Sequence, residues 1–145
     1  HMLENIIALA AFIPIIIGMG GNIGTQSSTI IVRGMATGRI EIGNELKIFF
    51  KELRVGLILG VLYGVMLGIF ANFRFIDTDP MLGLVVGLSV LCSMLIAVAV
   101  GSFTPLILRK LDIDPAVATG PFVTTSIDML GVMFYFVIAG LLLNI

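Results

Sequence analysis

Four long apolar stretches, separated by short charged segments, dominate the pattern of hydrophobic and polar positions in this chain of 145 residues. The stretches cover residues 3–32, 55–73, 81–108 and 114–143. Each approaches or exceeds the roughly 20 residues that a helix needs to cross a bilayer. The pattern therefore predicts an all-α integral membrane protein, built as a bundle of four transmembrane helices.

The segment between the first two stretches, residues 33–54, has a different periodicity. From residue 42 to residue 53, apolar side chains recur at helical spacing on one face, and charged side chains occupy the other. This amphipathic pattern predicts a short interfacial helix that runs into the second span. Its apolar face holds Ile42, Leu46, Phe49, Phe50 and Leu53, and its charged face holds Glu45, Lys47, Lys51 and Glu52.

Composition supports the membrane assignment, because 59% of the residues are hydrophobic and 12% are charged, against about 25% charged in soluble domains. The net charge of −1 gives no indication of a nucleic-acid partner. Cys92 is the only cysteine, which excludes an intrachain disulfide. We expect no enzyme, since no nucleophile–base pair or phosphate-binding loop is recognisable. Residues 1–2 resemble a cloning remnant, so the domain is expected to cover residues 3–145.

The basic residues are distributed unevenly between the connecting segments. Segments 33–54 and 109–114 hold seven of the eight Lys and Arg residues, whereas the link 74–80 holds only Arg74. The positive-inside rule then places both basic segments in the cytoplasm and both termini outside a multi-pass plasma-membrane protein. In the links, Asp79-Pro80 and Asp114-Pro115 are typical of helix starts, although Asp112 and Asp114 could also meet cations at the cytoplasmic mouth.

Small residues recur every four positions in the second and third spans, a spacing that lets helix backbones approach closely in lipid. We expect tight packing in a compact bundle from this pattern, and it could also include a subunit interface. The second span has Gly56, Gly60, Gly64 and Gly68, and the third has Ser89, Ser93, Ala97 and Gly101.

Asp128 is the only charged side chain in residues 115–145. A carboxylate near the centre of a spanning helix costs about 2.5–3.5 kcal/mol on insertion scales, so such residues usually mark a functional site. Its helix face is oxygen-rich, with hydroxyls at Thr124 and Thr125, and the spans contain no His. Oxygen ligands with few carboxylates suit a hydrated hard cation, Mg²⁺ above all, better than zinc or copper. The face consists of Val117, Pro121, Thr124, Asp128, Gly131 and Tyr135.

The first span has a polar middle, GMGGNIGTQSST, whose glycines weaken helical order. We therefore expect irregular backbone there, covered by protein or by a wet cavity. Asn22 lies eleven residues from Arg33, and Asp128 lies fourteen from Asp114. At about 1.5 Å per residue both sit near the membrane midplane, which favours a transport site between the first and last spans. A purely structural network of interhelical hydrogen bonds is the alternative. The pore-lining candidates are Asn22, Gln26, Val117, Pro121 and Thr125.

Two motifs resemble the MgtE family of magnesium channels and its eukaryotic solute-carrier relatives. They are PIIIGMGGNIGTQSSTIIVRGMATG at residues 14–38 and DPAVATGPFVTTSIDMLG at residues 114–131. The spacing between them also agrees, so the resemblance covers nearly the whole chain. Some bacterial members have Asn in place of Thr25 and of Gly120, an additional span before the first one here, and cytoplasmic regulatory domains.

The resemblance implies a homodimeric, Mg²⁺-selective channel with its pore along the dimer axis. The acid of the family's last helix matches Asp128, whose two copies would hold a largely hydrated Mg²⁺. The other positions that match pore-facing or ion-contacting residues are Gly21, Thr25, Thr29, Gly120, Thr124 and Gly131.

Two functional classes remain open at this point. The first is a divalent-cation channel or transporter, for Mg²⁺ or for another ion such as Co²⁺ or Mn²⁺. The second is a non-conducting membrane scaffold whose polar segments only hold helices together.

Overall fold

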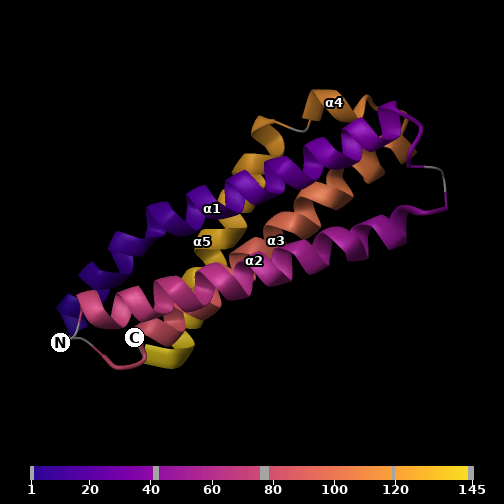
Figure 1. Ribbon diagram of the computed structural model, residues 1–145. Coiled ribbons are helices and arrows are strands. Elements are labelled where there is room, and N and C mark those ends of the chain that lie inside the picture. The colour runs from indigo at the N-terminus through magenta and orange to yellow at the C-terminus, as the bar shows by residue number, and fades with distance from the viewer. Residues whose placement is uncertain (1, 41–42, 76–78, 119, 144–145) are drawn as a thin grey trace.

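The chain folds into a bundle of long helices that lie side by side (Figure 1). The computed structural model describes residues 2–40, 43–75, 79–118 and 120–143. Within these ranges the helices are α1 (Met2–Ala36), α2 (Glu45–Arg74), α3 (Leu82–Lys110), α4 (Pro115–Ala118) and α5 (Pro121–Leu143).

Four of these helices, α1, α2, α3 and α5, are long and apolar enough to cross a membrane, which confirms the four predicted spans. Consecutive long helices run in opposite directions, so α1 begins and α5 ends at the same end of the bundle (Figure 1). Many large apolar side chains on the outside are exposed, as expected for a surface that faces lipid.

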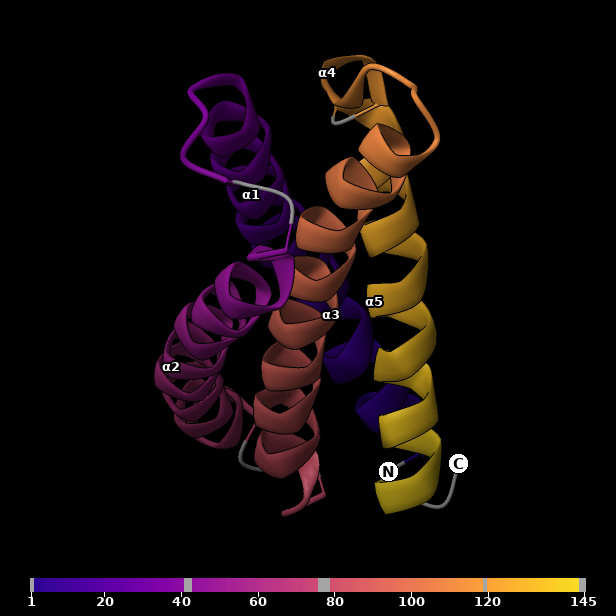
Figure 2. The same cartoon turned by 90° about the vertical axis from the view of Figure 1, so that its right-hand side faces the viewer.

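The central element is α3, which contacts α1, α2, α4 and α5. Figure 2 shows it in the middle of the bundle, between α2 and α5. Its buried residues, which include Val85, Val90 and Ala97, form much of the main core. In contrast, α2 packs chiefly on α3 and meets α1 mainly through side chains near its two ends, namely Glu52 at one and Phe70 at the other.

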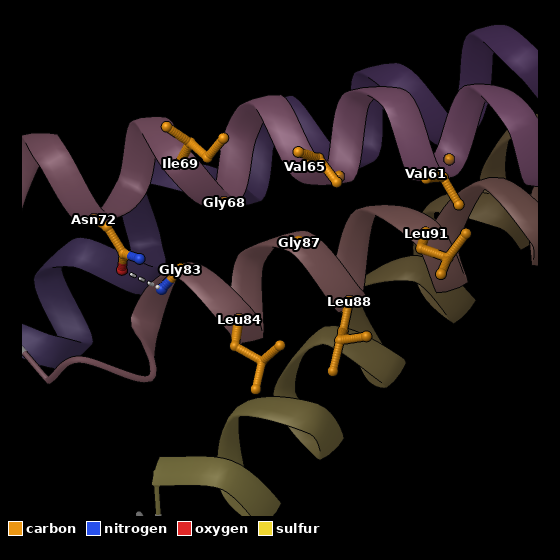
Figure 3. Close-up of a pocket in the computed structure, with 12 residues that line it drawn as sticks. Val61, Val65, Gly68, Ile69, Asn72, Gly83, Leu84, Gly87, Leu88 and Leu91 are labelled. Carbon is orange, nitrogen blue, oxygen red and sulfur yellow. Dashed lines mark hydrogen bonds between the residues drawn. The ribbon is translucent and has the colours of Figure 1, made fainter.

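Glycine lets α2 lie directly on the backbone of α3, as the four-residue spacing predicted. A Cβ added to Gly64 would lie 2.7 Å from the carbonyl oxygen of Gly87, and one added to Gly68 would lie 2.7 Å from that of Gly83. No real side chain could occupy those positions without moving a helix. Figure 3 shows the resulting groove of about 320 Å³, with glycines between apolar rims and Asn72 Oδ1 accepting a hydrogen bond from the Gly83 N–H at 3.0 Å.

The second small-residue stripe, on α3, faces α1 and α5 rather than α2. A Cβ at Gly24 would lie 3.0 Å from the carbonyl oxygen of Ala97, and one at Gly131 would lie 3.2 Å from Ser93 Oγ. The Ser93 hydroxyl also donates to the carbonyl of Ile16 at 3.4 Å. Thus α3 uses one small-residue face for α2 and another for α1 and α5.

The expectation of irregular backbone in the first span is wrong, because α1 is continuous from Met2 to Ala36. Its polar side chains are compatible with a helix, since two of them donate back to the carbonyl four residues earlier. Thr25 Oγ1 donates to Gly21 O and Thr29 Oγ1 to Thr25 O, both at 2.8 Å. Such bonds satisfy a hydroxyl without breaking the helix.

The interfacial helix and the last span also differ from their predicted forms. Residues 45–54 are not a separate helix but the first turns of α2, which continues without a break to Arg74. The last span is divided into α4 and α5, because Pro121 has no N–H to continue an incoming helix and is suited to begin a new one.

Two aspartates act in helix starts, as predicted. Asp79 Oδ1 accepts a hydrogen bond from the Met81 N–H at 2.8 Å, just before α3. Asp114 Oδ1 accepts one from the Ala116 N–H at 2.9 Å, in the first turn of α4. Both carboxylates satisfy N–H groups that a helix leaves without partners.

Substitution of Gly64 tests the backbone contact between α2 and α3. In Gly64→Ala the added methyl must push against Gly87 O, so we expect a loss of about 1–3 kcal/mol in the free energy of unfolding. The matched control is Gly18→Ala, where the new Cβ meets no atom within 4 Å and Ala favours the helix by roughly 0.5–1 kcal/mol. Unfolding of both variants is measured in one detergent, and equal stabilities would contradict the packing argument.

Candidate cation site

The carboxylate of Asp128 lies half-buried on α5, beside the middle of α1. It lies close to the backbone of α1 at Gly21, where an added Cβ would lie 3.4 Å from Asp128 Oδ1. Among the described residues, no hydrogen bond or ion pair engages this carboxylate. Both of its oxygens therefore keep their lone pairs for a ligand, which is unusual for a carboxylate in an apolar helix.

Three predicted residues of α1 share the helix face that begins beside Asp128. Gly21, Thr25 and Thr29 follow one another at intervals of four residues, and the two hydroxyls donate along this row to the carbonyls of Gly21 and Thr25. Thr25 is half-buried and Thr29 is exposed. Because each hydroxyl proton is used within the helix, the outward side of each oxygen offers only acceptor lone pairs.

The other polar residues of α1 point in two directions. Asn22 and Gln26 are exposed, next to the row of Gly21, Thr25 and Thr29. Ser27 and Ser28 are buried on the opposite side, toward the rest of the bundle. The polar middle of the first span is therefore divided between an outer face, available to a ligand, and an inner face that contacts other helices.

On α5 the structure separates the predicted face into two parts. Thr124 is half-buried and its hydroxyl donates to the carbonyls of Gly120 and Pro121 at 3.2 and 3.1 Å. Pro121 and Thr125 are exposed, and an added Cβ at Gly120 would meet no atom of the described residues within 4 Å. These residues line the open side of the helix together with Asp128. The side chain of Val117 lies outside what the structure describes.

Gly131 and Tyr135 belong to the buried part of that face. Gly131 packs against Ser93 of α3, so in this chain its lack of a side chain serves a helix contact. Tyr135 is 1% exposed and donates its hydroxyl to the carbonyl of Leu9 at 2.8 Å. This bond joins α5 to α1 two turns from Asp128.

Glu52 is a buried carboxylate that the sequence pattern misplaced. It was expected on the charged face of an interfacial helix, but it is 7% exposed and accepts a hydrogen bond from Ser27 Oγ at 3.3 Å. The sequence does contain a sign of this burial. Glu52 stands four residues before Gly56, so it continues the glycine stripe of α2 that faces α3. Glu52 joins α2 to α1, whereas Asp128 joins nothing among the described residues.

The described residues contain no cluster of three or more His, Cys, Asp or Glu side chains that could enclose a metal ion. A single chain therefore offers one carboxylate at this site, accompanied by neutral oxygens of hydroxyls, amides and main-chain carbonyls. Such a donor set suits a hard cation that keeps most of its water, and it does not suit a dehydrated ion in a closed protein cage.

Comparison with known proteins identifies the family of this chain. The family model described as "MgtE: Divalent cation transporter" matches residues 13–138. The chain belongs to the MgtE family. This confirms the resemblance of the two sequence motifs, and a family of transporters agrees with the expectation that the chain is not an enzyme.

Individual MgtE proteins match nearly the whole chain. It is 38% identical to the magnesium transporter MgtE of Thermus thermophilus over 143 residues, which are 99% of this chain and 31% of that protein. The MgtE proteins of Bacillus subtilis and Enterococcus faecalis are 35% and 37% identical over 94% of the chain. The chain spans about 30% of the length of these relatives.

Tyr135→Phe tests how much the bond to Leu9 stabilises the contact between α5 and α1. The substitution keeps the ring and removes one buried hydrogen bond, so we expect the free energy of unfolding to fall by about 0.6–1.7 kcal/mol. Tyr63→Phe is the matched control, because Tyr63 is 38% exposed and should tolerate the loss of its hydroxyl. Thermal unfolding of both variants is the measurement, and equal melting temperatures would argue against this contact.

Proposed function

We propose that this chain forms a membrane-spanning, ion-conducting part of a magnesium transporter in which Asp128 binds the cation. The observation that carries the proposal is the position of Asp128, a carboxylate without a described protein partner, 3.4 Å from the position of a Cβ at Gly21. A carboxylate with a purely structural role is expected to have hydrogen-bond donors, as Glu52 has in Ser27. This contrast supports ion binding over the scaffold interpretation.

The surrounding oxygens favour a hydrated ion. Thr25, Thr29 and Thr124 each donate their hydroxyl proton to a main-chain carbonyl, so their oxygens can accept hydrogen bonds from water around a cation. Mg²⁺ releases its water reluctantly and typically binds proteins through one or two carboxylates. The relatives are named magnesium transporters, which supports the same ion, while Co²⁺ and Mn²⁺ remain competitors to be tested.

A membrane potential is sufficient to drive this ion inward. A potential of 100 mV supplies about 2.3 kcal/mol per elementary charge, hence about 4.6 kcal/mol for a divalent cation. Residues 6–36 and 121–143, which carry the proposed site, lie in helices long enough to cross the membrane. Passive flux through a path lined by these helices therefore needs no other energy source.

A second copy of the chain completes the proposed site. One Asp128 provides a single negative charge for a divalent cation, and a two-fold axis next to the open face of α1 and α5 would bring two together. Exposed polar residues on this face, such as Asn22, Gln26 and Thr125, would be costly against lipid and are accommodated if they line a wet interface. The pore would then follow the dimer axis.

Asp128→Asn tests the assigned cation ligand. The variant keeps size and removes charge, so a folded protein should lose at least about tenfold in Mg²⁺ affinity, because contacts to charged groups contribute about 1.5–3 kcal/mol. Thr124→Val should cost less than about tenfold, since it removes a neutral oxygen. Binding and flux are measured in proteoliposomes together with thermal stability, and the series is repeated with Co²⁺ and Mn²⁺.

Asp79→Asn is the control for that series, because Asn replaces Asp well at a helix start and Asp79 lies far along the chain from the site. It should leave affinity and flux unchanged. Unchanged Mg²⁺ binding and flux in folded Asp128→Asn would refute the assignment of the site.

Crosslinking tests the dimer. A cysteine at position 22 in a Cys92→Ala background should form covalent dimers in lipid, because Asn22 is exposed on the face proposed to meet its copy. A cysteine at position 58, where Ile58 is 66% exposed on α2, is the control and should remain monomeric. Only monomers at position 22, under conditions that retain flux, would exclude the dimeric site.

Labelling tests the proposed orientation, in which both termini are extracellular. In the same Cys92-free background, a cysteine at position 47 should be shielded from an impermeant reagent in intact cells, and one at position 74 should react. Lys47 and Arg74 are both exposed and lie near opposite ends of α2. A difference in labelling between the two positions therefore reports on which side of the membrane each one lies. Reaction at position 47 in intact cells would show that the orientation is the opposite of the one proposed.

A further inference from the structure

A basic hollow of about 660 Å³ lies at the start of α2, at the end of the bundle opposite the chain termini (Figure 1). Its lining includes Arg39, Lys47, Lys51 and Arg54, together with Asn44 and the ring of Phe50. Among the described residues that line it, none is acidic. The hollow shares no residue with the proposed cation site, so the function of Asp128 does not account for it.

The positive charges in this hollow are not neutralised by the described carboxylates around them. Lys47, Lys51 and Arg54 follow at intervals of four and three residues, which places them on one face of α2. None of them forms an ion pair with a described acid. Of the two acids on the same helix, Glu45 accepts from the Gly43 N–H at 2.8 Å, and Glu52 is buried with Ser27.

The start of α2 adds hydrogen-bond donors to this charge. Asn44, the residue before the helix, makes no capping hydrogen bond with its side chain, so its amide can donate into the hollow that it lines. The first N–H groups of a helix also favour an anion nearby. The combination of basic side chains, an amide and a helix start is complementary to a phosphate group.

The position of the hollow relative to the membrane surface indicates which kind of phosphate it can bind. From Arg54 to Phe73, α2 has twenty residues, or about 30 Å at 1.5 Å per residue, which equals the hydrocarbon thickness of a bilayer. Arg54 and Lys51 therefore reach the level of the lipid headgroups. Apolar residues exposed to lipid, Val55 and Ile58, follow directly, and Phe50 in the hollow itself is 55% exposed.

We propose that this hollow binds the headgroup phosphate of an anionic phospholipid, with the acyl chains lying along α2 beyond Arg54. A soluble acidic protein segment would satisfy the charges but leave Phe50 and the adjoining apolar surface without a complementary contact. A phospholipid satisfies both. The bound lipid would fix the start of α2 at the membrane surface, independently of ion binding at Asp128.

Native mass spectrometry of the purified chain tests this site, with phosphatidylglycerol and phosphatidylcholine of identical acyl chains added in equal amounts. The wild type should retain phosphatidylglycerol preferentially, and less so at 500 mM than at 50 mM salt. A variant with Lys47→Gln, Lys51→Gln and Arg54→Gln should lose at least about tenfold of that preference, since each basic residue near the surface contributes about fivefold. Helix content by circular dichroism checks that this variant is folded.

Three controls separate the alternatives. Lys47→Arg with Lys51→Arg keeps the charge and should keep the preference. Arg74→Gln with Lys110→Gln removes charges outside the hollow and should also keep it. Inorganic phosphate at the lipid's concentration should displace no phosphatidylglycerol. Displacement by phosphate would assign the hollow to a free anion, and equal retention of both lipids by the wild type would leave an acidic soluble partner. Either result overturns the proposal.

Discussion

Apolar side chains in a bilayer gain little by leaving hydrocarbon for a neighbouring helix, so helices associate where their backbones can come close. In this protein α3 provides that approach on two sides, at Gly87 for α2 and at Ala97 for α1. The glycines opposite, Gly64 and Gly24, have no room for a side chain. The face of α3 that takes α1 also takes α5, where Gly131 lies against Ser93, and the part of α5 that carries Asp128 is then turned away from α3.

The different surroundings of the two carboxylates, Glu52 and Asp128, follow from this arrangement. Glu52 continues the glycine stripe of α2 and is therefore carried into the bundle, where Ser27 donates to it. Asp128 precedes Gly131 by three residues, yet it lies far enough around α5 to face the backbone at Gly21 instead of α3. Glu52 is buried with a hydrogen-bond donor and is therefore a structural contact. Asp128 lies beside a glycine, whose missing side chain leaves space for a ligand.

The sequence was sufficient for the parts of the structure that depend on composition and regular spacing. Span positions follow from apolar length, and the contact of Gly64 with α3 follows from the four-residue repeat. The spacing alone could not identify the helix that each small-residue stripe contacts, because Ser93 and Gly101 could equally have faced α2. The prediction of an irregular first span was wrong because the hydroxyls of Thr25 and Thr29 find acceptors within the helix, at Gly21 O and Thr25 O, so this polar segment needs no irregular backbone to satisfy them. The family resemblance supplied positions such as Gly21, and the structure adds that this glycine lies next to Asp128.

The continuity of α1 also has a chemical consequence for the site. In a regular helix, Gly21, Thr25 and Thr29 project in one direction, and each threonine donates its proton to the carbonyl one turn earlier. The hydroxyls therefore present oxygen lone pairs outward and no proton, as does Thr124 on α5. Such a row is complementary to a cation or to the protons of its water shell, and it offers an anion no donor. Under the proposed function, the ordered helix would therefore contribute to discrimination between ions of opposite charge.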